Sequence, residues 1–272
     1  MNRSLISHMI EAPLVRGLTY DDAVRIFWID NTAPMRELLE RTGTEQPEAI
    51  HALAESFSAA CLLSGTLKDG QRLTFKMSST LLGLWIMADA EASGSVRAYI
   101  DAGSEAASGT HQTSERSASD TYGTIRCVSS SASGQFTGIT DLPHRSMARG
   151  IEHYFRQSEQ NEICIRTRLD LRGGRCHSSE AVFAQLLPNA PEGLLRRVAA
   201  SLDGTGPLWD LEPVRSMRTL DELPVRWQCY CSQEMLAGMA GLLERSGSAA
   251  DSEANVKSGE AVCRICGQRY QL

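Results

Sequence analysis

Four of the eight cysteines in this chain lie in two close pairs near its C-terminal end. The first pair is Cys229-Tyr-Cys231, and the second, which follows after the intervening segment 232–262, is Cys263-Arg-Ile-Cys266. Zn²⁺ prefers four tetrahedral sulfur or nitrogen ligands, with sulfur at about 2.3 Å. A Cys-x-x-Cys turn followed by Gly267 can direct two thiolates toward one ion, and two cysteines on one side of an extended segment can also converge. The pattern therefore predicts one zinc ion held by four thiolates, a closed site of structural or regulatory type.

The segment that carries these pairs has few large apolar side chains, so hydrophobic burial alone can hardly fold it. A bound zinc ion would contribute on the order of 10–16 kcal/mol to its folding. Oxidants attack thiolates preferentially, and each pair is close enough in sequence to form its own disulfide. The residues alone leave two interpretations open: an inert zinc clip, and an order-to-disorder switch driven by oxidation.

The other four cysteines are scattered along the chain, at Cys61, Cys127, Cys164 and Cys176. Cys61 lies on the apolar face of a helical pattern and is predicted to be a small core residue. The N-terminal residues lack the apolar stretch of a signal peptide. The longest apolar run, Leu81–Ala88, is far shorter than the roughly 20 residues that cross a bilayer. We therefore expect a cytoplasmic protein without a membrane partner, whose thiols are kept reduced.

Composition and motifs narrow the class of function. The 272 residues are enough for one large domain or two modest ones, and the net charge of −6 argues against binding nucleic acid mainly through phosphates. The sequence has no Walker P-loop, no glycine-rich dinucleotide motif, no Gly-x-Ser-x-Gly and no His-Glu-x-x-His. The six histidines are dispersed. No catalytic residue is indicated, and we expect the protein not to be an enzyme.

Hydrophobic periodicity predicts an α+β fold. Apolar residues recur at helical spacing over Pro47–Leu62, with a proline in the first turn. Alternation predicts strands at Arg72–Met77 and around Val96–Ile100, on either side of the apolar run, and the short connections favour an antiparallel meander. Further predicted elements are a helix over Ser146–Gln157 and strands at Thr124–Val128, Gln135–Ile139, Ile163–Leu171 and Val182–Leu187.

Several segments are predicted to lack regular structure. Polar, small residues over Asp101–Asp120 and Ser129–Gly134 indicate loops. Prolines and glycines interrupt Pro188–Arg226, which we interpret as a linker with short helices such as Leu194–Leu202. The serine- and glycine-rich stretch Arg245–Gly259 is expected to be weakly ordered.

The chain resembles the heat shock protein 33 family, the redox-regulated 33 kDa holdase chaperones of bacteria. That family ends in Cys-x-Cys-Ser and Cys-x-x-Cys-Gly-x-x-Tyr, which stand here as Cys229-Tyr-Cys231-Ser232 and Cys263-Arg-Ile-Cys266-Gly267-Gln-Arg-Tyr270. The stretch Tyr154-Phe155-Arg-Gln-Ser158-Glu159-Gln160 matches the family's Tyr-Phe-x-x-Ser-Glu-Gln motif. Weaker echoes follow in the family's order at Gly94-Ser-Val96-Arg97, Gln135-Phe-Thr-Gly138-Ile139 and Gln185-Leu-Leu187-Pro188.

The resemblance implies an α/β core domain with a mainly antiparallel sheet (residues 1–188), a helical linker (189–226) and a redox-sensing zinc-binding domain (227–272). It also implies a mechanism, in which the reduced, zinc-bound form is inactive. Oxidation would pair Cys229 with Cys231 and Cys263 with Cys266 and release the zinc. The unfolded zinc domain and linker would then expose apolar surface that holds unfolding client proteins without ATP, in an activated homodimer.

Three alternatives remain. The first is a zinc-clipped protein that kept the fold without the switch. The second is a thiol-disulfide oxidoreductase using Cys263 and Cys266, which would need an exposed thiol of low pKa at a helix N-terminus. The third is a zinc-ribbon nucleic-acid binder, for which Arg226, Arg264 and Arg269 supply a little local positive charge.

Overall fold

The computed structural model describes residues 10–80, 83–101, 121–246, 254–257 and 259–271. Its main feature is a ten-stranded sheet with the order β7-β6-β3-β4-β5-β10-β1-β2-β9-β8. The strands are β1 (Glu11–Thr19), β2 (Val24–Asp30), β3 (Arg72–Ser79), β4 (Leu84–Glu91), β5 (Ser95–Asp101), β6 (Gly123–Ser131), β7 (Gly134–Asp141), β8 (Ile163–Arg172), β9 (Arg175–Leu186) and β10 (Arg218–Trp227).

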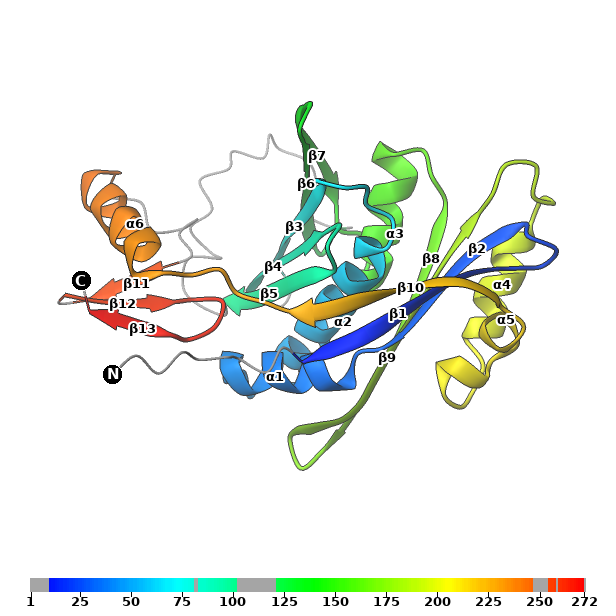
Figure 1. Cartoon of the computed structure of the whole chain (residues 1–272), viewed down its shortest axis with the longest axis horizontal. Coiled ribbons are helices and arrows are strands. Elements are labelled where there is room, and N and C mark those ends of the chain that lie inside the picture. The colour runs from blue at the N-terminus through cyan, green and yellow to red at the C-terminus, as the bar shows by residue number, and fades with distance from the viewer. Residues whose placement is uncertain (1–9, 81–82, 102–120, 247–253, 258, 272) are drawn as a thin grey trace.

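The helices before residue 216 flank this sheet on both faces, and the last helix lies with a second, three-stranded sheet at one end of the molecule (Figure 1). The helices are α1 (Thr32–Thr42), α2 (Pro47–Ser64), α3 (Met147–Ser158), α4 (Leu194–Leu202), α5 (Glu212–Arg215) and α6 (Gln233–Ser246), with a 3-10 helix η1 (Leu208–Asp210). The small sheet contains β11 (Ala254–Lys257), β12 (Glu260–Cys263) and β13 (Arg269–Gln271). The predicted α+β class with a mainly antiparallel sheet is confirmed.

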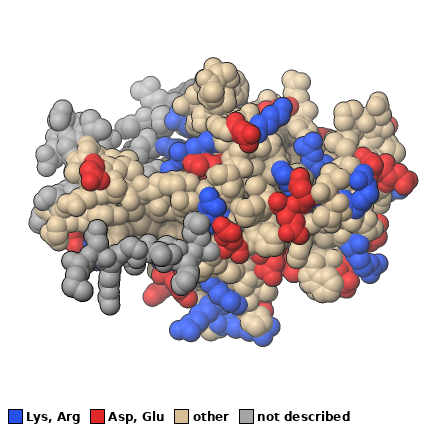
Figure 2. Space-filling model, viewed as in Figure 1, with Lys and Arg blue, Asp and Glu red and all other residues tan. Residues whose placement is uncertain are grey.

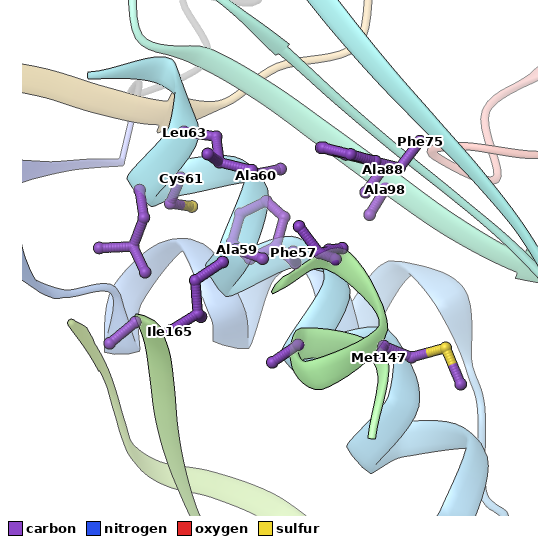
Figure 3. Packing of buried hydrophobic residues seen from close by; sticks show 14 of the residues in the cluster. Phe57, Ala59, Ala60, Cys61, Leu63, Phe75, Ala88, Ala98, Met147 and Ile165 are labelled. Atoms are coloured by element: carbon purple, nitrogen blue, oxygen red, sulfur yellow. The ribbon is translucent and has the colours of Figure 1, made fainter. Parts of the chain in front are cut away.

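The core forms where α2 crosses the main sheet. The helix starts with Pro47 at a position that tolerates proline, and nearly all of its residues are buried. Figure 3 shows Phe57 and Ala60 of α2 near Phe75, Ala88 and Ala98 of the strands. Small alanines at this crossing let the helix backbone approach the sheet closely, so that the aromatic rings fill the remaining space.

The two halves of the sheet meet at the C-terminal end of β10. There Arg226 and Trp227 pair in parallel with Ser95 and Val96 of β5, while Arg218–Arg226 pair antiparallel with β1 on the other side. Gly94 in the preceding turn has φ +81°, and a Cβ there would lie 2.1 Å from the carbonyl oxygen of Pro224. Only glycine permits this approach, which accounts for the first of the weaker family echoes.

The linker contains the short helix predicted at Leu194–Leu202, but its last part is a strand that the sequence did not indicate. Residues 194–215 form α4, η1 and α5, but 218–227 form β10, which pairs with β1 near the other end of the chain. Most of β10 is exposed, and its sequence contains Pro224 and several charges. It therefore lacks the apolar alternation by which a strand is recognised in sequence.

Other differences concern the ends of elements and the N-terminal region. Ser129–Gly134 is not a loop but the tip of the β6–β7 hairpin. Elements β1, β2, α1 and α6 were not predicted from the sequence. The predicted loop at Asp101–Asp120 lies outside the described residues, apart from Asp101 at the end of β5. Most of Arg245–Gly259 does so too, although Ala254–Lys257 form β11.

Candidate metal centre

The structure brings together the four cysteines that the sequence pairs. Cys229 and Cys231 lie in the short connection between β10 and α6. Cys263 ends β12, and Cys266 lies in the turn that leads to β13. Within the described residues, this is the one group of histidine, cysteine or acidic side chains that could hold a metal ion.

The four sulfur atoms are close enough to share a single ion. All lie within 4.8 Å of one another. The Sγ atoms of Cys231 and Cys266 are 3.3 Å apart, and those of Cys229 and Cys263 are 3.6 Å apart. Sulfur atoms at about 2.3 Å from a tetrahedral ion are about 3.8 Å from each other, so the donor set fits such an ion. A disulfide at about 2.05 Å is much shorter, and all four cysteines are free thiols here.

Local backbone geometry explains the residues that flank the cysteines. Gly267 has φ +69°, and its N–H donates to the carbonyl oxygen of Cys263 at 2.8 Å. This left-handed residue closes the Cys-x-x-Cys turn. Ser232 accepts a hydrogen bond from the N–H of Met235 at 3.2 Å, which satisfies a donor at the start of α6. The glycine and serine of the sequence motif therefore shape the two half-sites.

The close approach of the thiols perturbs their protonation. Hydrogen bonds from Cys229, and then from Cys266, hold the pKa of Cys263 far below its usual range. The hydrogen bond to Cys263 raises the pKa of Cys229 in turn. Contact among the thiols thus favours ionisation of Cys263, at the place where a divalent cation would balance the charge.

The cysteine cluster also belongs to an apolar interface between the C-terminal segment and the main sheet. Met87 and Tyr99, on β4 and β5, form one hydrophobic cluster with Ile265, Leu236 and the buried thiols. Trp85, Trp227, Met235 and Met239 pack against its edge. Trp85, Met87 and Tyr99 could not be assigned to the site from the sequence, because only the fold shows that these side chains lie under it.

Polar contacts reinforce this interface. Arg264 forms an ion pair with Asp101 of β5 at 3.2 Å. The hydroxyl of Tyr230 donates to Glu91 at 3.2 Å. The guanidinium of Arg41 lies over the ring of Trp227, 5.0 Å from its centre. The cysteine centre therefore packs against the core through side-chain contacts, in addition to its covalent connection through β10.

The four scattered cysteines take no part in the site, and all are buried. Burial raises the pKa of Cys127 and of Cys164 to about 12 and that of Cys176 to about 11. Burial likewise raises the pKa of Cys61. These groups are thiols at neutral pH and react slowly with oxidants. The prediction that Cys61 is a core residue is confirmed.

The upstream motif has a packing role. Tyr154 of α3 is 1% exposed and meets Phe75 edge-on, with ring centres 6.4 Å apart. A Cβ on Gly138 of β7 would lie 2.5 Å from the Tyr154 hydroxyl oxygen, so this glycine makes room for the ring. Ser158 ends α3, and Gln160 just beyond it has φ +51°. The motif thus secures one helix to the sheet and ends it.

Comparison with known proteins agrees with this arrangement. Residues 13–272 match the family model described as Hsp33 protein. The "33 kDa chaperonin" of Staphylococcus aureus strains Newman and COL is 24% identical over 285 residues, covering 95% of this chain and 94% of the relative. The crystal structure of the 33 kDa chaperonin (heat shock protein 33 homolog) from Thermotoga maritima superposes with a TM-score of 0.72 at 16% identity. That superposition covers 96% of this chain and 94% of the other. No helix in the described residues is long and apolar enough to cross a membrane. The chain belongs to the Hsp33 protein family.

Proposed function

We propose that this protein is a redox-regulated, ATP-independent holdase, whose sensor is one zinc ion bound by Cys229, Cys231, Cys263 and Cys266. The observation that supports this proposal is the double role of the cysteine cluster. The four thiols gather within 4.8 Å, and the same residues pack against an apolar patch of the core. Loss of the metal would therefore weaken both the fold of the C-terminal segment and its cover over the core.

Zinc suits the donor set because four soft thiolates in a tetrahedral arrangement favour this ion. When bound, the ion would neutralise thiolate charge and cross-link the β10–α6 connection to the turn before β13. The C-terminal segment contributes few large apolar side chains to its own core, so this cross-link would supply folding energy that burial alone does not.

Activation would proceed by oxidation of the four thiolates with a peroxide. Two molecules of H₂O₂ and four protons would accept four electrons, giving two disulfides and four waters. A disulfide sulfur is a poor ligand, so the oxidised segment would no longer bind the metal. The family resemblance pairs Cys229 with Cys231 and Cys263 with Cys266. The Sγ contacts at 3.3 and 3.6 Å run between the two pairs, and all four Sγ atoms lie within 4.8 Å of one another. Peptide mapping of the oxidised protein would therefore decide the pairing.

The surface that becomes available would be apolar. Release of the C-terminal segment uncovers Trp85, Met87 and Tyr99 on the outer face of β4 and β5. The linker helices cover a second apolar patch, where Leu194, Val198 and Leu202 pack on strands β2, β8 and β9. Exposed apolar patches of this kind bind unfolded protein segments.

We assign residues 1–188 to the core domain, 189–226 to the linker and 227–272 to the redox-sensing zinc domain. The core domain and the linker are not separate folding units, because strand β10 at the end of the linker is hydrogen-bonded into the core sheet. The division therefore describes the roles of the three segments. The proposed partners are unfolding proteins and, in the activated form, a second copy of the chain, in the cytoplasm.

The structure gives less support to the alternatives. Cys263 is 1% exposed and ends a strand, whereas an oxidoreductase needs an accessible thiol at a helix N-terminus. Each arginine of the proposed nucleic-acid surface pairs with a carboxylate: Arg226 with Glu11, Arg264 with Asp101 and Arg269 with Glu260.

The deciding experiment measures light scattering from a heat-unfolding client enzyme, with this protein either reduced and zinc-loaded or oxidised with peroxide at mild heat. We expect only the oxidised form to suppress aggregation. A Cys263→Ser/Cys266→Ser variant should lose this redox dependence, whereas Cys176→Ser should keep it. Equal suppression by both forms of the unaltered protein would indicate a chaperone without a switch, and no suppression by either would exclude the holdase.

A further inference from the structure

Two methionines of helix α6 border the cysteine centre. Met235 and Met239 are separated by about one helical turn, so their side chains lie on the same face of the helix. Leu236, which adjoins both positions, is fully buried in the hydrophobic cluster that contains Cys263 and Cys266. Both methionines pack against the edge of this cluster. The contact between α6 and the centre is therefore made by a leucine flanked by two thioethers.

Solvent reaches these two side chains, which separates them from other methionines of the chain. The sequence has nine methionines. Four of the described ones are at most 4% exposed, namely Met35, Met77, Met87 and Met147. The partly exposed ones are Met217, Met235 and Met239. Since a thioether is oxidised where the oxidant can reach its sulfur, two of the three accessible methionines in the described residues adjoin the proposed sensor.

The third accessible methionine, Met217, provides a comparison. It lies between α5 and the start of β10 and packs against the hydrophobic cluster of the linker. Figure 2 shows basic and acidic side chains mixed over the visible surface at the end of the molecule where α4 and α5 lie in Figure 1. Arginine side chains can donate to a sulfoxide oxygen, whereas the cluster beside α6 consists of apolar side chains and thiols. A sulfoxide is therefore tolerated more easily at Met217.

Peroxide converts a thioether into a polar group. A lone pair of the methionine sulfur attacks one oxygen of H₂O₂, the O–O bond breaks and an S–O bond forms, and the second oxygen leaves as water after proton transfer. The sulfur loses two electrons, which the peroxide accepts, so one H₂O₂ gives one methionine sulfoxide and one water. The flexible apolar side chain becomes a polar one with a hydrogen-bond acceptor. Peroxide is also the oxidant of the proposed activation, so no further reagent is needed.

A sulfoxide at either position disfavours the packing of α6. An oxygen placed at the edge of an apolar cluster loses its hydrogen bonds to water unless the side chain turns outward, away from the cluster. Helix α6 starts two residues after Cys231, and Ser232 caps its first turn. The helix also contacts all three strands of the small sheet, including β12, which ends in Cys263. Displacement of α6 is therefore transmitted to both cysteine pairs.

We propose that Met235 and Met239 form a second oxidation site, whose sulfoxides keep α6 from packing on the cluster after the cysteines have been reduced again. This step rests on the proposed function. Disulfides are reversed by exchange with thiols, whereas methionine sulfoxide is restored by dedicated reductases. Release of the zinc segment exposes both side chains, so thiol oxidation comes first and methionine oxidation follows under lasting stress. The protein then keeps its sulfoxides after thiols and zinc have returned, and regains its inactive form more slowly.

The first test locates the oxygen. The reduced, zinc-loaded full chain is treated with graded peroxide, its thiols are then reduced and alkylated, and trypsin releases the peptide between Arg226 and Arg245. We expect fragment masses to place one and then two oxygen atoms on the methionines of this peptide, at doses that leave Met35 unaltered. A Cys263→Ser/Cys266→Ser variant, whose segment is already released, should form both sulfoxides at lower doses. Equal doses for the variant would reject the order of the two steps, and sulfoxide no more abundant than at Met35 would refute the site.

The second test measures recovery. After peroxide treatment, dithiothreitol and zinc are added, the return of all eight thiols is confirmed with a maleimide reagent, and proteolysis after Trp227 is followed. We expect cleavage of the unaltered protein to stay about fivefold faster than before oxidation, the factor for the low end of the cost of an unpaired polar group. Met235→Leu/Met239→Leu should regain its original resistance, because leucine keeps the apolar volume but forms no sulfoxide. Met217→Leu, the matched control, should recover no better than the unaltered protein.

A further variant tests the packing effect without an oxidant. Met235→Gln/Met239→Gln places a polar group of similar length at both positions, and its reduced, zinc-loaded form should be cleaved about fivefold faster than the double leucine variant. Equal resistance of these two variants, or full recovery of the unaltered protein with its sulfoxides in place, would contradict the proposed role of the methionines. None of these measurements uses a client protein, so a failure of the holdase assay leaves their outcome unchanged.

Discussion

The phenol of Tyr270 connects the end of β13 to the first cysteine pair. Its hydroxyl oxygen lies 3.3 Å from Sγ of Cys231 and donates to the carbonyl oxygen of the same residue at 3.1 Å. The contact with Cys231 also raises the pKa of Tyr270, so the group remains a donor at neutral pH. The Tyr270 side chain thus links β13, which follows the second cysteine pair, to the first pair, and this link does not require a metal.

Removal of this hydroxyl should loosen the centre. We expect Tyr270→Phe to destabilise the C-terminal segment by about 0.5–1.5 kcal/mol, the usual net value of one hydrogen bond. Metal release under peroxide should accelerate accordingly, as followed with a colorimetric zinc indicator. Tyr230→Phe is the matched control, since Tyr230 is 44% exposed and its hydroxyl bonds to Glu91 outside the cluster. Equal rates for Tyr270→Phe and the unaltered protein would show that the contact does not restrain the centre.

Loss of one thiol should abolish metal binding. We expect Cys263→Ser to lower the zinc content from about one ion per chain to nearly none, because a three-sulfur set lacks the closed shell of a structural site. The C-terminal segment should then lose its fold, seen as protease sensitivity after Trp227. Cys176→Ser, which alters a buried cysteine far from the centre in sequence, should retain the metal. Full zinc content in Cys263→Ser would mean that other ligands hold the ion.

The docking of the linker should depend on its apolar face. Leu202 in α4 is 1% exposed, and it packs with Val198 against the sheet. Leu202→Ala should cost about 2–5 kcal/mol by leaving a cavity. We expect faster hydrogen exchange over residues 194–217 and a lower temperature for peroxide activation. Leu220→Ala removes a side chain that is 55% exposed and should leave both unchanged. Exchange as slow in Leu202→Ala as in the unaltered protein would contradict this account.

A buried ion pair beneath the outer sheet face should make stability depend on acid. Asp89 accepts from Arg72 at 2.7 Å and from Arg97 at 2.9 Å, and its side chain is 3% exposed. Burial acts to raise the pKa of Asp89, but the bonds and charges of Arg72, Thr74 and Arg97 outweigh it, and the net shift is downward. A lowered folded-state pKa gives stability that is present above the unfolded value of about 3.9 and lost as pH falls through the folded value.

Replacement of this carboxylate gives the corresponding test. Asp89→Asn should destabilise the protein by about 3–5 kcal/mol at pH 7, because it leaves the buried guanidinium of Arg97 without this counter-charge. Urea unfolding at pH 7 and below pH 4 should show a smaller loss on acidification for the variant than for the unaltered protein. Asp221→Asn, at an exposed pair with Arg16, should cost less than about 1 kcal/mol. If the free energy of unfolding fell equally on acidification in Asp89→Asn and in the unaltered protein, the acid dependence would belong to other carboxylates.

The residues of the cysteine centre and the regular local elements could be predicted from sequence. The two cysteine pairs, with Ser232 and Gly267 beside them, are local patterns whose chemistry is specific. Helix α2 and strand β3 were predicted because the helical period of the one and the strict alternation of the other are visible within one short window. The family motifs then joined these pieces into an expected order.

The tertiary structure alone decided the pairing of distant segments. Strand β10 is stabilised by β1, from the other end of the chain, and by the turn at Gly94, so its own exposed and charged sequence carries little strand signal. Nothing in the sequence around Trp85 and Tyr99 indicates a contact with the cysteines; the fold shows that both side chains lie under them. Local sequence determines which elements can form and which atoms can react. The pairing of β10 with β1 and the apolar surface under the cysteines depend instead on contacts between residues far apart in the sequence, which form only when the chain between them is closed into a loop.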